Sequence, residues 1–469
     1  MNPGPEKAGI FAYICYMKCR VTIVFAVFSL LVVFPAFSQE VNPLIPSTKH
    51  SYVRCLDMEK YELFLEKQDP GRKARRDAAM KQMAKWTELH GLKRTDSVAS
   101  YTIPIVFHVL WNSATPAEKI SLAQLKRQIE VLNRDYNRIN ADTIDTPGPF
   151  KPAATSFNIS FCLAQTDPNG KPTTGVVYKQ TSTTSFSYSN NAAKLPYLGG
   201  DTIWDPNKYL NIWICNLSGG LLGYSEFPTK PLDNTFGSVI FYEAVGDSGY
   251  LPLPAYNLGR TITHEIGHLL DLHHPWGDDG GLCPGSGGTD DGCADTPPEG
   301  NNLNDGYGQG WGPTFGCPPF PYTDNCSTTS PGIMFENYME YSNDSCMNLF
   351  TKDQYTIASA ALSGPLAILV TSTACTAPSS IQEYIFNASV NVYPNPSPGK
   401  FNVAVSLSDP SHLNIEVISV LGQTIQTLNS DNANGKTYSL DLSAQPEGLY
   451  FVKISNTSFS IVKKIMVSR

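Results

Sequence analysis

Two kinds of hydrophobic pattern alternate along the middle of the chain. Residues 101–111 form an almost unbroken run of β-branched and aromatic side chains, which predicts a buried strand. Residues 119–137 instead repeat apolar side chains at the spacing of one helix face, namely Ile120, Leu125, Ile129, Leu132 and Tyr136. Similar runs predict further strands at 157–164, 209–215 and 237–243, and a helix at 258–272. The alternation favours an α/β (α+β) domain with a mixed sheet.

The pattern changes after residue 350. Thr351-Lys352-Asp353-Gln354 matches a capping box and predicts a helix that runs to about residue 370. Residues 376–388 are expected to be a linker. Beyond it, stretches of alternating polarity predict short strands at 389–393, 401–407, 413–419, 423–428, 438–442, 448–455 and 459–467. So many short strands within residues 389–469 predict a small all-β, immunoglobulin-like sandwich.

The first residues have the features of an export signal. The apolar run at 21–35 is short for a membrane span, follows Lys18 and Arg20, and precedes the small residues of 36–38. We therefore predict a signal peptide over residues 1–38, with Met17 as the true start, and no stable membrane span. A retained membrane anchor is the alternative.

A charged segment follows the predicted signal. Residues 39–98 are rich in Lys, Arg, Glu and Asp and carry helical stretches at 58–66 and 74–89. This order, with a globular domain at 99–375 behind it, is typical of a secreted zymogen whose pro-segment ends near Lys93-Arg94. The net charge of −8, with no long basic block, gives no reason to expect a nucleic-acid partner.

Export would place the cysteines in an oxidising compartment. Of the eleven, Cys15 and Cys19 would leave with the signal peptide. Eight of the remaining nine could pair there, namely Cys162, Cys215, Cys283, Cys293, Cys317, Cys326, Cys346 and Cys375. Cys55 is then the odd thiol.

The segment from His264 to His274 carries the strongest chemical signal. His264 and His268 are four residues apart, so on a helix they face the same way and can hold one zinc ion. Glu265 between them is placed to act as general base. His274, six residues after His268, is the expected third ligand. The neighbouring His273 is the alternative third ligand, and a surface helix that happens to be rich in histidine is the alternative to a metal site.

The turn between the second and third ligands departs from the usual pattern. Position 271 should be Gly, because the chain must reverse there through left-handed backbone angles. Asp271 is among the few other residues that adopt those angles, so we expect the turn to survive at a modest cost.

A long loop of Gly, Pro, Asn, Asp and Cys follows at 275–332. Its cysteines favour an ordered, stapled loop rather than a disordered one. Its carboxylates, Asp278, Asp279, Asp290, Asp291, Asp295 and Glu299, are of the type that binds calcium. They match no EF-hand spacing, so a solvated acidic loop is the alternative.

Several blocks outside the zinc motif resemble one family. Asn337-Tyr338-Met339-Glu340-Tyr341-Ser342 resembles the Met-turn of metzincin proteases, in which a Met underlies the three histidines. Residues 210–215, 220–228, 256–261, 295–297 and 341–346 resemble the small microbial, ulilysin-like or cytophagalysin branch of the pappalysins. This resemblance spans roughly residues 99–375.

The resemblance implies a zinc endopeptidase with His264, His268 and His274 as ligands and Glu265 as base. It implies that Tyr341 leans toward the zinc site and that Cys55, after Arg54, is a cysteine switch, with an ordinary free thiol as the alternative. It also implies structural calcium, for which the candidate ligands are Asp278, Asp295, Thr296 and Glu299. Asp271 departs from the family's Gly, and the insertion at 301–330 is longer than usual.

The C-terminal region carries a second resemblance. Val392-Tyr393-Pro394-Asn395-Pro396 and the ending from Gly448 to Lys464 resemble the sorting domain of Bacteroidetes type IX secretion cargo. The type IX machinery would then be a partner, and the protein would be secreted or held at the cell surface. A carbohydrate-binding or adhesive module is the alternative.

These observations predict a secreted zinc endopeptidase, made as a zymogen, that acts on proteins or peptides. Asp344 follows the Met-turn, where metzincins build the pocket for the residue after the cut, so a preference for Arg or Lys is expected there. A solvated surface Asp is the alternative for that residue. The alternative functions are a catalytically silent surface binding protein or adhesin and a hydrolase of non-peptide bonds. The intact Glu265 argues against the first, and the zymogen order argues against the second.

Overall fold

The hydrophobic run at 101–111 forms β1 (Tyr101–Trp111), the long central strand of a mixed sheet. The sheet has the order β3-β1-β5-β7-β6, and β4 pairs with the second half of β1. Its other strands are β3 (Ile159–Leu163), β4 (Val176–Gln180), β5 (Leu210–Cys215), β6 (Gly223–Tyr224) and β7 (Ser238–Phe241). All pairs are parallel except β6 with β7. The short β6 is therefore an antiparallel edge strand, and the predicted mixed sheet is confirmed.

This description comes from a computed structural model that describes residues 52–90, 100–247, 249, 253–300, 314–377, 389–407, 412–433, 435–456 and 460–469. The predicted signal peptide and the predicted end of the pro-segment near residues 93–94 lie outside these ranges, as does the first part of the 301–330 insertion.

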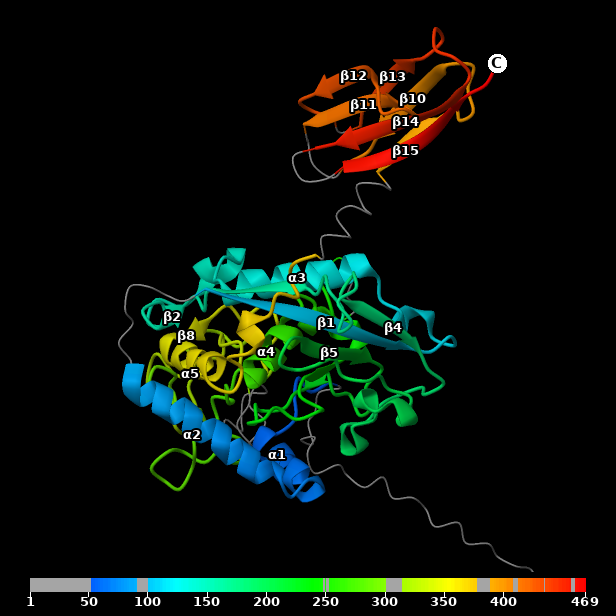
Figure 1. Ribbon diagram of the computed structural model, residues 1–469. Helices are drawn as coiled ribbons and strands as arrows, with labels where there is room; N and C mark the ends of the chain where they lie inside the picture. The colour runs from blue at the N-terminus through cyan, green and yellow to red at the C-terminus, as the bar shows by residue number, and fades with distance from the viewer. Residues whose placement is uncertain are drawn as a thin grey trace, which may run out of the picture. The chain divides into compact units, whose positions relative to one another are not determined.

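Two helices pack on the sheet and position the site. The amphipathic α3 (Leu122–Tyr136) begins at Ser121, whose side chain accepts a hydrogen bond from the backbone N–H of Gln124 at 3.1 Å. It buries Leu125, Ile129 and Leu132 and packs against β3, and in Figure 1 it is drawn above β1. The second helix, α4 (Arg260–Leu269), is buried on every side and contacts α3, β6 and β7. Burial of all its faces fixes α4 relative to the sheet.

The charged segment before the sheet forms α1 (Met58–Gln68) and α2 (Arg72–His90), as predicted. α2 contacts α5 (Lys352–Ser363), and the two helices are neighbours in Figure 1. α5 begins with the predicted capping box, but it ends at Ser363 rather than near residue 370. Gly364 follows, and the chain continues as turns with a short 3₁₀ helix at Leu369–Thr371. A two-stranded sheet of β2 (Ala154–Thr155) and β8 (Phe350–Thr351) precedes α5.

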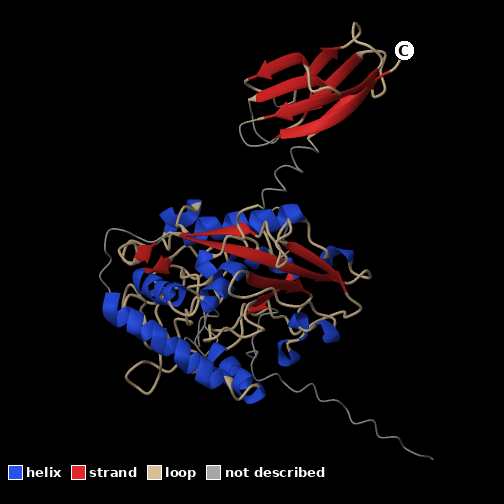
Figure 2. Cartoon of the chain, viewed as in Figure 1, coloured by secondary structure: helices blue, strands red, loops and turns tan. Residues whose placement is uncertain are grey.

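The region after residue 389 is all β, as predicted (Figure 2). One antiparallel sheet has the order β13-β10-β9 and the other β12-β11-β14-β15. The strands are β9 (Val390–Tyr393), β10 (Lys400–Val405), β11 (Leu413–Ser419), β12 (Thr424–Ser430), β13 (Thr437–Asp441), β14 (Gly448–Ser455) and β15 (Ser460–Val467). Their inward side chains, such as Val403, Val417 and Val452, share one core, so the two sheets form a sandwich.

The expectation that eight cysteines pair was wrong. The described residues contain three disulfides, Cys162–Cys375, Cys283–Cys326 and Cys317–Cys346. Cys215 and Cys293 are buried free thiols, like Cys55. Cys215 ends the central strand β5 inside the hydrophobic core, where it serves as a small apolar side chain.

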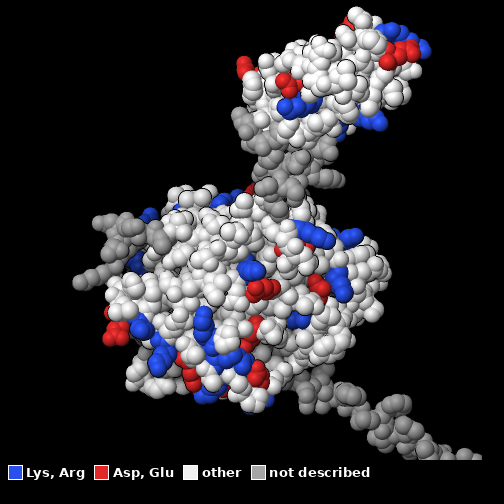
Figure 3. Space-filling model, in the orientation of Figure 1, with Lys and Arg blue, Asp and Glu red and all other residues white. Residues whose placement is uncertain are grey.

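Charged side chains are concentrated over part of the face shown in Figure 3, where a band of Lys and Arg follows α2. Among the described residues, no helix is long and apolar enough to cross a membrane.

Candidate zinc site

α4 places His264 and His268 one turn apart on the same face. The helix stops after Leu269, and Asp271 takes up left-handed backbone angles with φ of 71°. The chain therefore reverses at the position where the sequence predicted a strained turn, and it returns His274 to the first two histidines. Asp271 thus performs the turn that a Gly makes without strain.

The three imidazole rings meet through their Nε2 atoms. These atoms lie 3.2 Å apart for His264 and His274, and 3.1 Å apart for His268 with each of the other two. Each Nδ1 has an acceptor of its own: the carbonyl of Tyr338 at 2.9 Å, the carbonyl of Leu272 at 2.8 Å and the carboxylate of Asp278 at 2.8 Å. Because each ring donates through Nδ1, the three Nε2 lone pairs face one another. A metal cation satisfies such an arrangement.

Zinc fits this cluster. Nitrogen ligands at about 2.0–2.1 Å in a tetrahedron are about 3.3–3.4 Å apart, close to the observed separations. Cys55 completes a set of four, since one ligand atom from each residue lies within 4.8 Å of the others. Among the described residues, no other group of three or more His, Cys, Asp or Glu side chains meets that criterion. Burial lowers the pKa of His264 and His268 well below the usual value and that of His274 to about 3, so all three rings are neutral, which is the form in which imidazole binds a metal.

Met339 lies beneath α4 and is fully buried. A Cβ atom on Gly267 would lie 2.3 Å from the Sδ atom of Met339. Met339 therefore packs directly against α4 at Gly267. Its role as an apolar floor under the three histidines stays a prediction.

Replacing Gly267 by Ala is expected to lower the free energy of unfolding by about 1–3 kcal/mol, the usual cost of overpacking a core. Ala is otherwise the better helix former by about 1 kcal/mol, so a decrease would isolate the clash with Met339. Thermal unfolding would measure it. Gly148→Ala, at a position with no atom within 4 Å of an added Cβ, is the matched control. A melting temperature for Gly267→Ala at or above that of the native protein would contradict the packing argument.

Glu265 points into the same space without joining the histidines. Its carboxylate accepts a hydrogen bond from the Ser225 hydroxyl at 2.7 Å, and the same hydroxyl contacts the Glu265 backbone carbonyl at 2.9 Å. Burial raises the pKa of Glu265 to about 8, while the hydrogen bond from Ser225 lowers it. Glu265 is thus held beside the cluster by a residue that sequence reasoning did not single out.

Arg54, just before Cys55, is fully buried against Asp344. Its Nη2 donates to Asp344 Oδ1 at 2.8 Å and to the Ser342 carbonyl at 2.7 Å. Its Nη1 donates to Thr261 Oγ1 at 3.3 Å, and its guanidinium lies 5.0 Å from the centre of the Tyr256 ring. Asp344 is therefore not a solvated surface residue here. It is the charged end of a closed pocket that holds an arginine.

Tyr341 also contacts the N-terminal segment. Its hydroxyl donates to the backbone carbonyl of Cys55 at 2.8 Å and lies 3.2 Å from that of Leu56. Its ring centre is 5.1 Å from that of His274. The Tyr341 hydroxyl thus donates to the backbone carbonyl of the residue whose thiol lies at the histidine cluster.

His273 lies apart from the cluster, so geometry favours His274 as third ligand. The His273 ring stacks on Phe227 with centres 4.4 Å apart, and its Nδ1 is 3.4 Å from a carboxylate oxygen of Glu59 in α1. These contacts tie the turn after α4 to the N-terminal segment.

The four candidate calcium ligands do not gather around one point. Asp278 accepts hydrogen bonds from His274 and from the Met58 backbone, so it orients the third histidine. Asp295 accepts from the backbone of Asp353, and Thr296 donates to Asp291. Glu299 accepts from Thr314 beside Glu340. The predicted calcium gains no support from this arrangement.

Two further contacts near the cluster could not be predicted from the sequence. Asp271, noted only for its backbone, forms an ion pair with Arg76 of α2 at 2.6 Å. Trp276 stacks on His274 with ring centres 4.3 Å apart. Neither pairing follows a local spacing, because each depends on how the N-terminal helices and the loop after α4 fold over the cluster.

A His-Glu-x-x-His helix, a third histidine after a tight turn and a Met beneath them define the class of zinc metalloproteases. Residues 200–363 match the family of pregnancy-associated plasma protein-A, the pappalysins. An extracellular metalloprotease of Colletotrichum graminicola is 32% identical over 268 residues, which span 55% of this chain and 75% of the relative. One from Uncinocarpus reesii is 30% identical over 270 residues, 56% of this chain and 76% of the relative. The chain belongs to the pappalysin family.

Two solved metalloprotease structures are also similar to this chain. Tannerella forsythia mature mirolysin with a cleaved peptide is 45% identical, with a TM-score of 0.52, over 58% of this chain and 97% of that one. A variant of T. forsythia promirolysin is 42% identical, with a TM-score of 0.56, over 67% of this chain and 95% of that one. The precursor thus covers more of this chain than the mature enzyme. The chain is a secreted zinc metalloprotease that is made as a zymogen. Residues 52–90 are the part of the predicted pro-segment that the structure describes, and we refer to them as the pro-segment.

The C-terminal sandwich has its own match. Residues 391–468 match the secretion system C-terminal sorting domain. This match implies type IX secretion and, with the extracellular relatives, places the protein outside the cell or on its surface.

Proposed function

We propose that the mature protein is an endopeptidase in which His264, His268 and His274 hold zinc, Glu265 is the general base and Asp344 selects Arg or Lys after the cut bond. One observation carries the proposal. The pro-segment places a thiol at the histidine cluster and, one residue earlier, an arginine on Asp344. The filling of both places by one pro-segment supports the proposal that both are parts of one substrate site.

Bound zinc would supply a Lewis acid for the peptide carbonyl and for the attacking water. Glu265 accepts the proton of that water and then delivers it to the leaving nitrogen. Removal of the pro-segment admits water around Glu265, which reverses the burial that raises its pKa. The Tyr341 hydroxyl, released from the Cys55 carbonyl, donates to the oxyanion.

The pocket around Asp344 suits a guanidinium. Asp344 Oδ2 accepts from the backbone N–H groups of Leu258 at 2.9 Å and Arg260 at 3.2 Å, which leaves Oδ1 for the incoming side chain. A buried ion pair is favourable only when hydrogen bonds satisfy both partners, and these contacts provide them. Arg54 therefore stands where a substrate arginine would bind.

The direction of the pro-segment explains why it occupies the site without being a substrate. Arg54 precedes Cys55, whereas a substrate arginine in the same pocket would follow the reacting carbonyl. The pro-segment must therefore run opposite to a substrate. Cys55 would bind zinc as a thiolate in place of the water. The boundaries 39–98 for the whole pro-segment, 99–375 for the catalytic domain, 376–388 for the linker and 389–469 for the sorting domain remain our predictions.

Replacing Cys55 by Ala in the uncleaved chain is expected to raise peptidase activity by roughly tenfold or more, since each 1.4 kcal/mol of lost pro-segment affinity is a factor of ten. The assay is the initial rate on a fluorogenic peptide with Arg after the bond, while gels confirm that the chain is intact. Cys293→Ala removes another buried free thiol away from the cluster and is the matched control.

An uncleaved Cys55→Ala chain that stays as inactive as the native one would contradict the proposed switch. If the processed native protein were also inactive with zinc bound, the silent binding protein would become the better account.

A further inference from the structure

The pro-segment carries a second arginine into the catalytic domain. Arg76 of α2 pairs with Asp271 at 2.6 Å, and its guanidinium lies 4.7 Å from the centre of the Phe227 ring. It also donates to the Pro228 carbonyl at 3.3 Å. Asp271 is almost fully buried in this state, at 3% exposure. A carboxylate, an aromatic face and a carbonyl together form a built site for a basic side chain.

This site lies along the same edge of the sheet as the Asp344 pocket. Leu222 N–H donates to the Val53 carbonyl at 2.9 Å and Gly223 N–H to the Arg54 carbonyl at 3.0 Å. Phe227 comes four residues after Gly223, which is roughly 13 Å of extended chain. Its ring centre is 5.9 Å from that of His268. Residues 222–227 at this edge of the sheet therefore contact Arg54 at one end and Arg76 at the other, and they pass His268 between the two.

The orientation of a substrate follows from the proposed function, on which this inference rests. If the Asp344 pocket takes the residue after the cut, the Phe227 end of the edge faces residues before the cut. At about 3.3 Å per residue, a side chain roughly three or four positions before the bond would reach Phe227.

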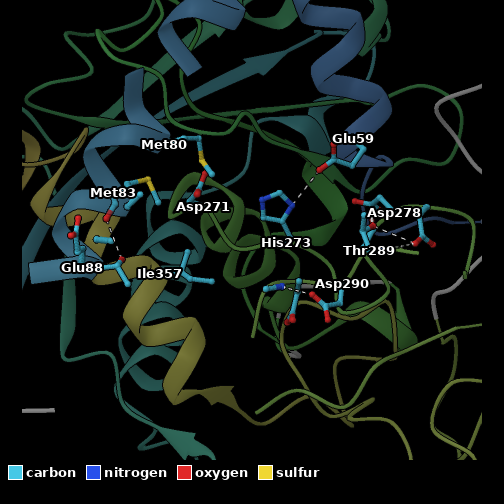
Figure 4. Close-up of a pocket in the computed structure, with 17 residues that line it drawn as sticks. Glu59, Met80, Met83, Glu88, Asp271, His273, Asp278, Thr289, Asp290 and Ile357 are labelled. Carbon is cyan, nitrogen blue, oxygen red and sulfur yellow. Dashed lines mark hydrogen bonds and ion pairs between the residues drawn. The ribbon is translucent and has the colours of Figure 1, made fainter. Parts of the chain in front are cut away.

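Removal of the pro-segment would open this end. A cavity of about 780 Å³ lies beside Asp271, between α2 of the pro-segment and the loop after α4 (Figure 4). Met80 and Met83 of α2 line one side of it, and Asp271, His273 and Asp290 line the other. Without α1 and α2, the Asp271 carboxylate would face an open groove.

We propose that Asp271 and Phe227, once Arg76 has left, form a second specificity site for an arginine or lysine on the amino side of the cut bond. Asp271 then has two roles. Its backbone makes the turn between the zinc ligands, and its carboxylate, which a Gly at this position would lack, selects the substrate.

The test uses the processed protein and peptides that all carry Arg after the bond. Arg, Lys, citrulline or Ala is placed in turn at each of the four preceding positions, and kcat/KM is measured for every peptide. Arg at one position is expected to raise kcat/KM about tenfold over citrulline, as for a hydrogen bond to a charged group. Each enzyme is judged by its own Arg-to-citrulline ratio, so a general change in activity cancels.

Asp271→Gly is expected to bring that ratio close to one, because Gly keeps the left-handed turn and removes the charge. Phe227→Leu should reduce the ratio while keeping the carboxylate. Asp233→Asn is the matched control, because Asp233 also binds pro-segment arginines, Arg72 and Arg75, and should leave the ratio unchanged. The zinc content of each variant is measured alongside.

An Arg-to-citrulline ratio near one at every position in the native enzyme would overturn the proposal, and Asp271 would then serve the pro-segment alone. A ratio that survives in Asp271→Gly would also overturn it. Both results leave the proposed function intact if the peptides are cut. If no peptide is cut, the proposed function fails and the second site fails with it.

Discussion

Glu265→Gln is expected to lower kcat about 10²–10⁴-fold while zinc remains bound, since that is the usual contribution of a general base. Gln has nearly the same size and can still accept the hydrogen bond that Ser225 donates to Glu265 at 2.7 Å. It cannot accept the proton of the attacking water. Turnover of a peptide and zinc content of the same sample measure the two halves of this expectation.

The zinc measurement distinguishes a base from a ligand. Glu265 is outside the set of Cys55, His264, His268 and His274, so its replacement should leave the metal in place. His268→Ala, by contrast, should lose both zinc and activity. A Glu265→Gln enzyme that retains more than a tenth of native kcat would contradict the assigned role.

Asp344→Asn is expected to lower kcat/KM for peptides with Arg after the bond about 30-fold or more, because breaking a buried charged pair costs about 2–5 kcal/mol. Asn can still accept the backbone hydrogen bonds from Leu258 and Arg260, so the pocket should keep its shape. The loss should therefore be confined to basic side chains.

A peptide with Leu at the same position is the internal comparison. Its kcat/KM should change little in Asp344→Asn, so that the Arg-to-Leu ratio falls. Asp247→Asn, which removes a carboxylate paired with Arg127 elsewhere, should leave that ratio unchanged. An unchanged ratio in Asp344→Asn would mean that Asp344 holds only the pro-segment arginine.

Local patterns predicted most of the fold. The run at 101–111, the apolar stripe of α3 and the capping box at Thr351 each reflect short-range chemistry, and the structure contains all three elements. The alternation of polar and apolar residues predicted the strands of the sandwich, with ends that differ from the observed ones by no more than two residues. Cysteine pairing was harder, because a disulfide needs two residues brought together by the whole fold. The sequence therefore could not tell that Cys215 lies inside the core.

In the site too, contacts between residues close in the sequence were predictable and long-range contacts were not. The spacing of His264, His268 and His274 is local, so it predicted that the three rings meet, and their Nε2 atoms do lie together. Ser225 reaches Glu265 from the edge of the sheet, and Arg76 reaches Asp271 from a helix about 200 residues earlier in the chain. Asp278 was a calcium candidate because carboxylates suit that ion. The structure instead uses it to orient His274.

The most direct test of the account is a cleavage map of a complex peptide mixture. The processed protein and its Glu265→Gln variant are incubated with the mixture, and mass spectrometry identifies the new ends. The account predicts cuts that depend on Glu265 and that cluster before Arg and Lys. Cuts made equally by the variant, or no cuts from processed protein shown to hold zinc, would contradict the claim that this site is a peptidase.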